Sequence, residues 1–203
     1  MSAILRYMHL TDIREVVIID RLSFTPAWSE QSYAYEVSKA PTSHMMVMQS
    51  VIDNASRWRR FIRPFTTNSG GKIWGYAGMW MIADEAHIST IASHPDERGK
   101  GIGEAILASL IQKAIHNQSA YVVLEVRVSN AVAQNLYHKY EFRIVDRRTN
   151  YYHDNHEDAF DMRLDLSDSE RITRLNTRYH TILQKLDCVD HFVTSPRPDI
   201  IHT

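Results

Sequence analysis

The chain has 203 residues, of which 44% are hydrophobic, so it is long enough and apolar enough to bury the core of one domain with appendages. Its 23 Lys and Arg residues nearly balance 24 Asp and Glu residues, which excludes a global attraction to nucleic acid or an anionic membrane. No run approaches the roughly 18 apolar residues of a membrane span, acidic residues interrupt the N-terminal stretch early, and the single cysteine excludes an internal disulfide. We therefore expect a soluble, cytoplasmic protein without membrane contact.

The first part of the chain predicts strands and two helices. Residues 3–10 alternate in polarity as a strand, and Thr11 or Asp12 then caps a helix, with Glu15 at capping-box spacing from Asp12. Ser29 starts a second helix. Three further strands are predicted over 44–51, 72–83 and 86–94, the last two as a hairpin joined at Asp84-Glu85.

Helices and strands continue to alternate after residue 100. The run 104–115 has apolar residues at three- and four-residue spacing and predicts an amphipathic helix. Residues 121–128 are nearly all apolar and predict a strand buried on both faces. A helix capped by Ser129 is predicted over 130–140, and two strands that complete the sheet are predicted over 142–150 and 159–166. This order indicates an α/β or α+β sandwich with a mixed sheet.

The loop Arg98-Gly99-Lys100-Gly101-Ile102-Gly103 stands directly before the helix of 104–115. A helix N-terminus presents unpaired N–H groups and a positive dipole end, and glycines let a phosphate approach both. The loop therefore predicts an anion site, with a pyrophosphate as the favoured ligand. A triphosphate P-loop is not matched, because its Lys-Ser or Lys-Thr is missing. A dinucleotide fingerprint, with Glu125 as its acidic residue, and a turn without a ligand both stay open.

Two segments stand outside this core. The insertion 52–71 contains four arginines interleaved with aromatics at Arg57 to Arg63, which suit RNA or an acidic surface, or else form a solvated loop or a short lid helix. The segment 167–203 begins with Ser167 and Glu170 at capping-box spacing. It carries an apolar helical stripe of Ile172, Leu175, Tyr179, Ile182, Leu183 and Leu186. The stripe predicts packing on the protein's own domain or on a second copy, as in a homodimer, so we divide the chain into a domain over 1–166 and a helical extension over 167–203.

Three residues carry candidate chemistry. Glu125 is the acid of its apolar strand, so its pKa should rise toward neutrality unless a cation such as Arg127 pairs with it. It can serve as a general base, and a structural Glu–Arg pair is the alternative. Tyr137 faces the same cleft from the next helix, where it either returns a proton to a leaving group or packs in the core. Asn130 opens that helix and either contacts an amide-bearing ligand or only starts the helix.

These features together resemble one enzyme family. The loop Arg98 to Gly103 is similar to the pyrophosphate loop of the GNAT superfamily of acetyl-CoA-dependent N-acetyltransferases. More narrowly, residues 3–166 without the insertion resemble the RimI-type ribosomal-protein alanine acetyltransferases. The likeness is carried by Thr25-Pro-Ala-Trp-Ser29, Thr90-Ile-Ala-Ser-His-Pro95, Leu124-Glu-Val-Arg-Val-Ser-Asn130, Asn135-Leu-Tyr137 and Arg147-Arg-Thr-Asn-Tyr-Tyr152 followed by Glu157-Asp-Ala159.

The resemblance implies a GNAT fold, which is a mixed, mostly antiparallel central sheet flanked by helices. It implies acetyl transfer to the N-terminal α-amine of a protein, with ribosomal protein S18 as the candidate, and Glu125 as base and Tyr137 as acid. Acetyl-CoA would be held by the backbone of Ile91, Ala92 and Ser93, by N–H groups of Arg98, Gly99, Lys100, Gly101, Ile102 and Gly103, and by Asn130. Trp28, Tyr151 and Tyr152 would line the entry for the peptide N-terminus.

Departures from the family pattern leave other functions open. Glu141 stands where the family has a glycine after the Tyr137 helix, and the extension has no counterpart. The insertion borders a strand near the expected peptide groove, which leaves the choice of peptide open. The acceptor is alternatively a polyamine, a drug or a lysine side chain, and a non-catalytic module that binds acetyl-CoA and docks through Arg57 to Arg63 is a third reading. No metal is expected, since no His-Glu-x-x-His occurs and His153-Asp-Asn-His156 lies in a hairpin loop.

Overall fold

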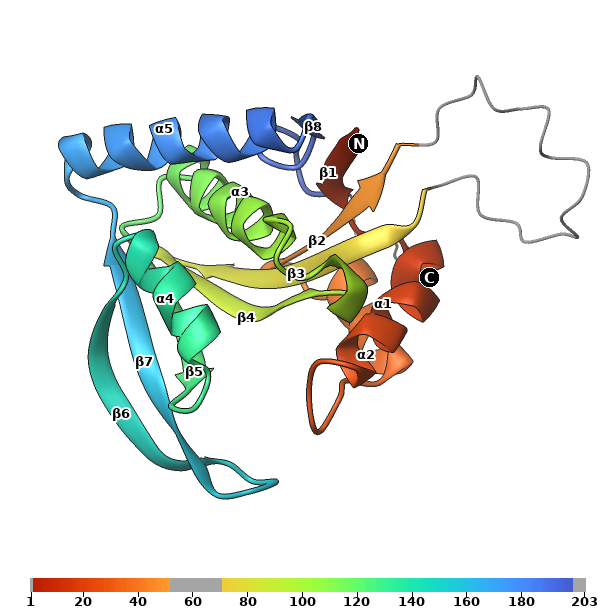
Figure 1. Cartoon of the computed structure of the whole chain (residues 1–203), viewed down its shortest axis with the longest axis horizontal. Coiled ribbons are helices and arrows are strands. Elements are labelled where there is room, and N and C mark those ends of the chain that lie inside the picture. Colours follow the sequence, from red (N-terminus) through yellow and green to blue (C-terminus); the bar gives the residue numbers. More distant parts are fainter. Residues whose placement is uncertain (1, 52–70, 199–203) are drawn as a thin grey trace, which may run out of the picture.

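The computed structural model describes residues 2–51 and 71–198, which form an eight-stranded sheet in the order β6-β7-β5-β4-β3-β2-β1-β8 (Figure 1). The strands are β1 (Ala3–Tyr7), β2 (Ser43–Ser50), β3 (Ile73–Ile82), β4 (Glu85–Ser93), β5 (Tyr121–Arg127), β6 (Arg143–Tyr152), β7 (Glu157–Asp165) and β8 (Cys188–Asp190). The helices are α1 (Ile13–Arg21), α2 (Glu30–Ser38), α3 (Ile102–His116), α4 (Ala131–Lys139) and α5 (Ser169–Lys185). Only β4 beside β5 and β8 beside β1 run parallel, so the predicted mixed, mostly antiparallel sheet is confirmed.

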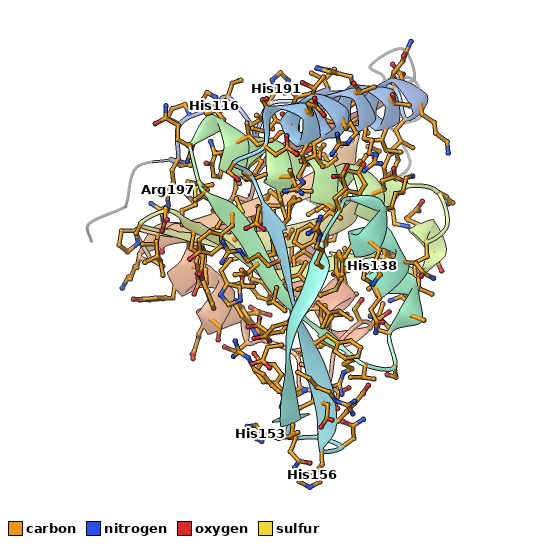
Figure 2. All side chains as sticks on the ribbon, turned by 90° about the vertical axis from the view of Figure 1, so that its left-hand side faces the viewer. His116, His138, His153, His156, His191 and Arg197 are labelled. Atoms are coloured by element: carbon orange, nitrogen blue, oxygen red, sulfur yellow. The ribbon has the colours of Figure 1, made fainter. Side chains whose placement is uncertain are left out.

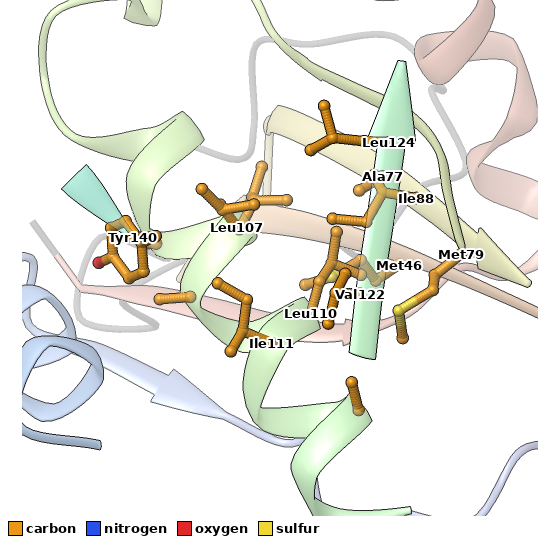
Figure 3. Packing of buried hydrophobic residues seen from close by; sticks show 14 of the residues in the cluster. Met46, Ala77, Met79, Ile88, Leu107, Leu110, Ile111, Val122, Leu124 and Tyr140 are labelled. Carbon is orange, nitrogen blue, oxygen red and sulfur yellow. The ribbon is translucent and has the colours of Figure 1, made fainter. Parts of the chain in front are cut away.

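Helices cover both faces of the sheet, because strand side chains point alternately to either side. On one face α3 packs Leu107, Leu110 and Ile111 against buried strand residues such as Met46 and Val122 (Figure 3). On the other face α1 and α2 enclose a second core. That core contains Val16, Val17, Ile19, Tyr33, Met45, Val47 and Tyr76. The two layers fix the sheet between them and place its central strands, β4 and β3, next to helices from both sides.

The C-terminal segment continues these layers. Every residue of α3 from Ala105 to Ile111 is buried, which requires cover on the side facing away from the sheet. α5 supplies that cover and lies over α3 in Figure 1, with Leu175 and Ile182 buried in the same core. The predicted packing of this stripe on the chain's own domain is confirmed. β8 then pairs with β1 at the sheet edge.

The pair β4 and β5 separates along its length. The two strands pair only at their first positions, Glu85–His87 with Tyr121–Val123. Beyond His87, β4 follows β3 with a register shift after Gly78, whereas β5 follows β7. Two strands held by different neighbours diverge, and their facing backbone edges have no strand partner. The sheet therefore opens between them.

Several helix starts differ from the sequence prediction. Asp12 precedes α1 but makes no side-chain cap, because its carboxylate is bound by Arg6 at 2.7 Å. Glu15 does not close a capping box, since it accepts from the backbone N–H of Ile73 at 2.8 Å. The cap of α4 is Asn130 rather than Ser129, and that of α5 is Asp168 rather than Ser167. Ser29 caps α2 as predicted, accepting from Ser32. At α1 the candidate capping side chains thus bind other partners, Asp12 the nearby Arg6 and Glu15 the distant Ile73.

Glu141, at the expected glycine position, joins α4 to α5. Its φ of +67° lies in the left-handed region, where a side chain costs backbone energy. Its carboxylate accepts from Arg174 at 2.9 Å and from Arg171 at 3.3 Å, and Arg178 lies at 3.4 Å. These arginines all come from α5, so the residue that departs from the family pattern binds the extension that has no family counterpart.

The residue that follows the insertion, Lys72, lies near the glycine loop. Residues 52–70, and with them the cluster Arg57 to Arg63, lie outside the described residues. Next to them, Lys72 contacts Glu97 at 3.2 Å, and Lys100 contacts the same carboxylate at 2.8 Å. Lys72, which follows the insertion, therefore lies beside Glu97, the residue that precedes the loop of Arg98 to Gly103.

Replacing Glu141 with Gln should destabilise the fold in a pH-dependent way. The hydrogen bond from Arg174, with the charges of the other arginines, lowers the pKa of Glu141 to about 2. An unfolded Glu titrates near about 4.3, so the ionised carboxylate stabilises the fold above that pH, and its contribution is lost as pH falls toward 2. At pH 7 we expect Glu141→Gln to lower the free energy of unfolding by about 1 kcal/mol and Tm by roughly 2–4 °C.

Thermal melts of wild type and variant between pH 2.5 and 7 measure this effect. The exposed Glu170, in the first turn of α5, supplies a matched control as Glu170→Gln. The difference in Tm between wild type and Glu141→Gln should become smaller below pH 4. A gap that is constant across this range would contradict the assignment of stability to the ion cluster.

Candidate active site

A cavity of about 370 Å³ lies where β4 and β5 separate. Its wall combines the end of α1 and the loop after it, the outer halves of β4 and β5, the start of α4 and the end of β6. The lining residues are Asp20, Ser23, Phe24, Thr25, Pro26, Trp28, Ile88, Ser89, Thr90, Ile91, Leu124, Glu125, Val126, Arg127, Asn130, Ala133, Tyr137, Tyr151 and Tyr152. The predicted site residues Trp28, Ile91, Glu125, Asn130, Tyr137, Tyr151 and Tyr152 are therefore brought together here. Ala92, Ser93 and the glycine loop are not part of the wall.

Glu125 lies between two basic side chains. Its Oε2 lies 2.8 Å from Nε2 of His87, and its Oε1 lies 3.2 Å from Nη2 of Arg148. Arg148 is held in turn by Asp161, to which its Nε donates at 2.8 Å. β5 is not buried on both faces as predicted, because its Glu125 side alternates with the core side and faces the cavity.

The exception allowed for Glu125, pairing with a cation, therefore applies, but the partners are His87 and Arg148 rather than Arg127. Burial raises the pKa, but the hydrogen bond from His87 and the charges of His87 and Arg148 together outweigh it, and the pKa is lowered. The same hydrogen bond raises the pKa of His87. The carboxylate is ionised at neutral pH and accepts hydrogen bonds only.

Arg127 is not the partner of Glu125. Its guanidinium contacts Asp154 at 2.9 Å and Glu157 at 3.1 Å and lies over the ring of Tyr152 at 3.8 Å. It also donates to the carbonyl of Thr25 at 3.3 Å. Arg127 thus links the β6–β7 hairpin to the loop after α1 and closes one side of the cavity.

Tyr137 and Asn130 reach the cavity from α4. The Tyr137 side chain is buried among core residues and touches the cavity with part of its surface, and this burial raises the pKa of its phenol. It therefore stays protonated across the working pH range and is able to donate a hydrogen bond. Asn130 caps α4, with its Oδ1 accepting from Ala133 at 3.1 Å, which leaves its amide N–H groups for a ligand.

Asp20 organises the loop of residues 23–29, a role that the sequence did not suggest. Its Oδ2 accepts from the backbone N–H of Trp28 at 2.6 Å. Its Oδ1 accepts from the hydroxyls of Tyr33, at 2.8 Å, and of Tyr76. An acid on the buried face of α1, beside Val16 and Val17, is the sequence signal that could have revealed it.

The glycine loop continues from the cavity rim. Arg98 donates to Ser23 of the cavity wall at 3.2 Å. Gly99 and Gly101 have positive φ values of 75° and 93°, and a side chain on Gly99 would meet only open space. The loop ends at the first turn of α3, whose N–H groups have no partner within the helix. Lys100 is paired with Glu97, so backbone N–H groups, rather than a free lysine, offer the anion site.

A second, more open hollow of about 500 Å³ adjoins the cavity at Trp28. It is lined by Trp28, Ser29, Gln31, Ser32, Tyr35, Glu36 and Trp80. The two hollows share Trp28, so a chain that leaves the cavity has a continuous surface to follow.

Comparison with known proteins identifies the family. The model of the acetyltransferase (GNAT) family matches residues 15–142, more than half of the chain. The chain belongs to the GNAT family of acetyltransferases. A Bacillus subtilis protein with the provisional name [ribosomal protein bS18]-alanine N-acetyltransferase is 34% identical over 161 residues, which cover 79% of this chain and 94% of that one.

Two Escherichia coli comparisons agree with this assignment. The [ribosomal protein bS18]-alanine N-acetyltransferase of strain K12 is 30% identical and spans 79% of this chain and 95% of its own. The crystal structure of the Escherichia coli ribosomal-protein-S18-alanine N-acetyltransferase superimposes with a TM-score of 0.65 at 28% identity, covering 82% of this chain and 96% of that one. The protein is therefore an N-acetyltransferase with a GNAT fold, and acetyl-CoA is the acetyl donor of this family.

The GNAT domain includes neither a metal cluster nor a spanning helix in its described part. Among residues 2–51 and 71–198, no three His, Cys, Asp or Glu side chains gather so as to hold a metal ion. His153 and His156 lie at the tip of the β6–β7 hairpin, apart from His116, His138 and His191 (Figure 2). None of the described helices combines the length and apolarity that crossing a bilayer requires.

Asp20→Asn should impair acceptor binding in this GNAT site and destabilise the domain. An Asn side chain has one oxygen where Asp has two, so it cannot accept from all three donors. At least one buried donor then loses its partner, at a cost of about 1–3 kcal/mol. The loop of Trp28 loses its anchor, and we expect KM for the acceptor to rise several-fold while KM for acetyl-CoA changes little. Tyr33→Phe is the matched variant, because it removes a donor from Asp20 but keeps the Trp28 bond.

Steady-state kinetics beside thermal melts separate the two effects. Tyr33→Phe should lower Tm with a smaller change in acceptor KM than Asp20→Asn. Equal changes of acceptor KM in both variants would show that Asp20 acts through stability and not through the loop.

Proposed function

We propose that this protein transfers acetyl from acetyl-CoA to the N-terminal α-amine of a protein, with ribosomal protein S18 as the candidate acceptor. The observation that carries the proposal is the meeting of Glu125 and Tyr137 in one cavity at the parting of β4 and β5. The relatives from Bacillus subtilis and Escherichia coli are named for this reaction. A ribosomal acceptor would place the reaction in the cytoplasm.

The donor would lie along the parted strands. The edge of β4 at Ile91, Ala92 and Ser93 has no strand partner on the β5 side, so its backbone groups are available to an acetyl and pantetheine chain. The Asn130 amide would bind the same chain. The pyrophosphate would lie on the N–H groups of the loop 98–103, where Gly99 leaves open space. The family supports this ligand over a dinucleotide.

An α-amine suits the base that this site offers. A terminal amine with a pKa near 7.8 is roughly 15% unprotonated at pH 7, whereas a free lysine is below about 0.1%. Because its pKa is lowered, Glu125 is a weak base that stays ionised and orients the amine by accepting its N–H. Once the nitrogen begins to bond to the acetyl carbon, its proton becomes acidic enough for such a carboxylate to take it. Holding amine and thioester together supplies much of the remaining acceleration.

Tyr137 would serve the leaving sulfur. Its raised pKa keeps the phenol protonated, so it can donate a hydrogen bond to the developing thiolate and return a proton to it. It lies on α4, one turn beyond Ala133, and both residues line the cavity.

The acceptor entry favours a peptide over a polyamine. Trp28, Tyr151 and Tyr152 line the rim, and the hollow beside Trp28 offers room for the following residues. A polyamine site needs free carboxylates, but Asp20 accepts from three donors and Glu125 contacts two cations. The non-catalytic reading is disfavoured because both candidate catalytic side chains face the cavity.

Glu125→Gln and Tyr137→Phe should each lower kcat/KM at least tenfold toward a short peptide with the S18 N-terminus. Gln is isosteric but cannot take a proton, and Phe keeps the packing but has no hydroxyl. Acetyl transfer is measured from pH 6 to 9, with Glu170→Gln, far from the cavity on α5, as the matched control.

Binding of acetyl-CoA, measured by calorimetry, should be within about threefold of wild type in both variants. Turnover in the variants equal to wild type would overturn the assigned roles. Wild-type binding of acetyl-CoA without peptide turnover would overturn the proposed acceptor.

A further inference from the structure

His87 contacts Glu125 without being part of the cavity wall. It occupies the last paired position of β4, opposite Val123, which is the vertex from which β4 and β5 part. Its Nε2 lies 2.8 Å from Oε2 of Glu125, yet His87 is absent from the cavity wall. A substrate in the cavity would therefore meet Glu125 and not the imidazole.

Packing fixes the orientation of this imidazole. The ring of Trp80 meets it edge-on, with ring centres 5.5 Å apart, and Trp80 is itself anchored through its indole N–H to Glu36 at 2.9 Å. Because an ionised Glu125 only accepts, Nε2 must carry a hydrogen. The free proton position is then Nδ1, which lies 3.8 Å from Oε1 of the half-exposed Glu85.

A proton can thus be added to His87 without breaking its bond to Glu125. The charged groups that surround the ring are Glu125 on β5, Glu85 on β4, and Arg148 on β6 with its partner Asp161 on β7. The two glutamates favour the imidazolium and Arg148 opposes it, and the pKa of His87 is raised, chiefly by the hydrogen bond to Glu125. His87 is therefore protonated more readily than an ordinary histidine.

We propose that His87 is a positioning residue that sets the basicity of Glu125: when neutral, its Nε2–H orients the carboxylate toward the cavity, and when protonated at Nδ1 it adds a second cation beside Arg148. The carboxylate between two full cations is a poorer proton acceptor than one beside Arg148 alone. Acetyl transfer then falls at low pH for two reasons, protonation of the acceptor amine and protonation of His87. This proposal rests on the proposed function and deepens it.

Two variants separate orientation from charge. In His87→Gln, the side-chain amide replaces the Nε2–H donor but cannot be protonated, whereas His87→Leu removes both donor and charge. At pH 8.5 we expect kcat of His87→Gln within about threefold of wild type and that of His87→Leu at least tenfold lower. Thermal melts verify that both variants fold, and His116→Gln, an exposed residue of α3, is the matched control.

The pH profile of kcat/KM then tests the charge. As the pH falls, the logarithm of the wild-type value should fall with a slope greater than one, since amine and His87 both take up protons. For His87→Gln the slope should be one, because the amine alone titrates. A slope of one in wild type, or identical profiles in wild type and His87→Gln, would overturn the proposal.

An NMR titration gives a readout that needs no turnover. The ring signals of His87, assigned by their loss in His87→Gln, should titrate above the ordinary histidine pKa of about 6.5, and in Glu125→Gln this midpoint should drop. An unchanged midpoint in Glu125→Gln overturns the proposal even if the peptide is acetylated. If the His87 midpoint drops in Glu125→Gln but the wild type does not acetylate the peptide, the result supports the His87–Glu125 pair and overturns the proposed acceptor instead.

Discussion

β4 and β5 part after His87 and Val123 because each strand is held by a different neighbour, and the candidate site depends on that parting. A continuous pair would close its backbone hydrogen bonds internally and leave no room between the strands. Separation exposes one edge of β4, opens the cavity, and turns the polar side of β5 toward it. The two strands remain in contact only at their base, where His87 and Glu125 hold each other across the junction.

The electrostatic design of the site follows from this geometry. Glu125 projects from a strand whose other side is core, so it would be costly to ionise without partners. His87 from the neighbouring β4 and Arg148 from β6, beyond β7, supply those partners, and they leave the carboxylate charged but weakly basic. Such a group suits an acceptor that is partly neutral at physiological pH. An α-amine meets this requirement and a lysine side chain does not.

The C-terminal extension supports the donor end of the site. α5 covers α3, and Ile182 lies so close to Gly101 that a Cβ there would approach its Cδ1 to 3.2 Å. Glu141 joins the same helix to the end of α4 through Arg171 and Arg174. The extension therefore packs on both helices that carry candidate site residues, α3 with its glycine loop and α4 with Tyr137.

Hydrophobic periodicity predicted the order of strands and helices, because the spacing of apolar residues within one segment depends only on which face of that segment is buried. Side-chain partners across the sheet were harder to predict from the sequence. Arg127, two residues from Glu125 on the same strand side, was the evident partner in sequence, but the β6–β7 hairpin supplies it with two acids of its own. His87 and Arg148 are 38 and 23 residues away from Glu125 in the chain, and only the register of β4, β5, β7 and β6 brings them together. Asp20 likewise acts through tyrosines from two other elements.

The most direct test of the account is to locate the transferred acetyl group on a peptide that offers both kinds of amine. A peptide with the S18 N-terminus and an internal lysine is incubated with acetyl-CoA and enzyme at pH 7.5 and mapped by tandem mass spectrometry, beside the same peptide with a blocked N-terminus and beside spermidine. The account predicts acetyl on the α-amine alone and no product from the blocked peptide or from spermidine. Acetylation of the lysine or of spermidine at a comparable rate would contradict it.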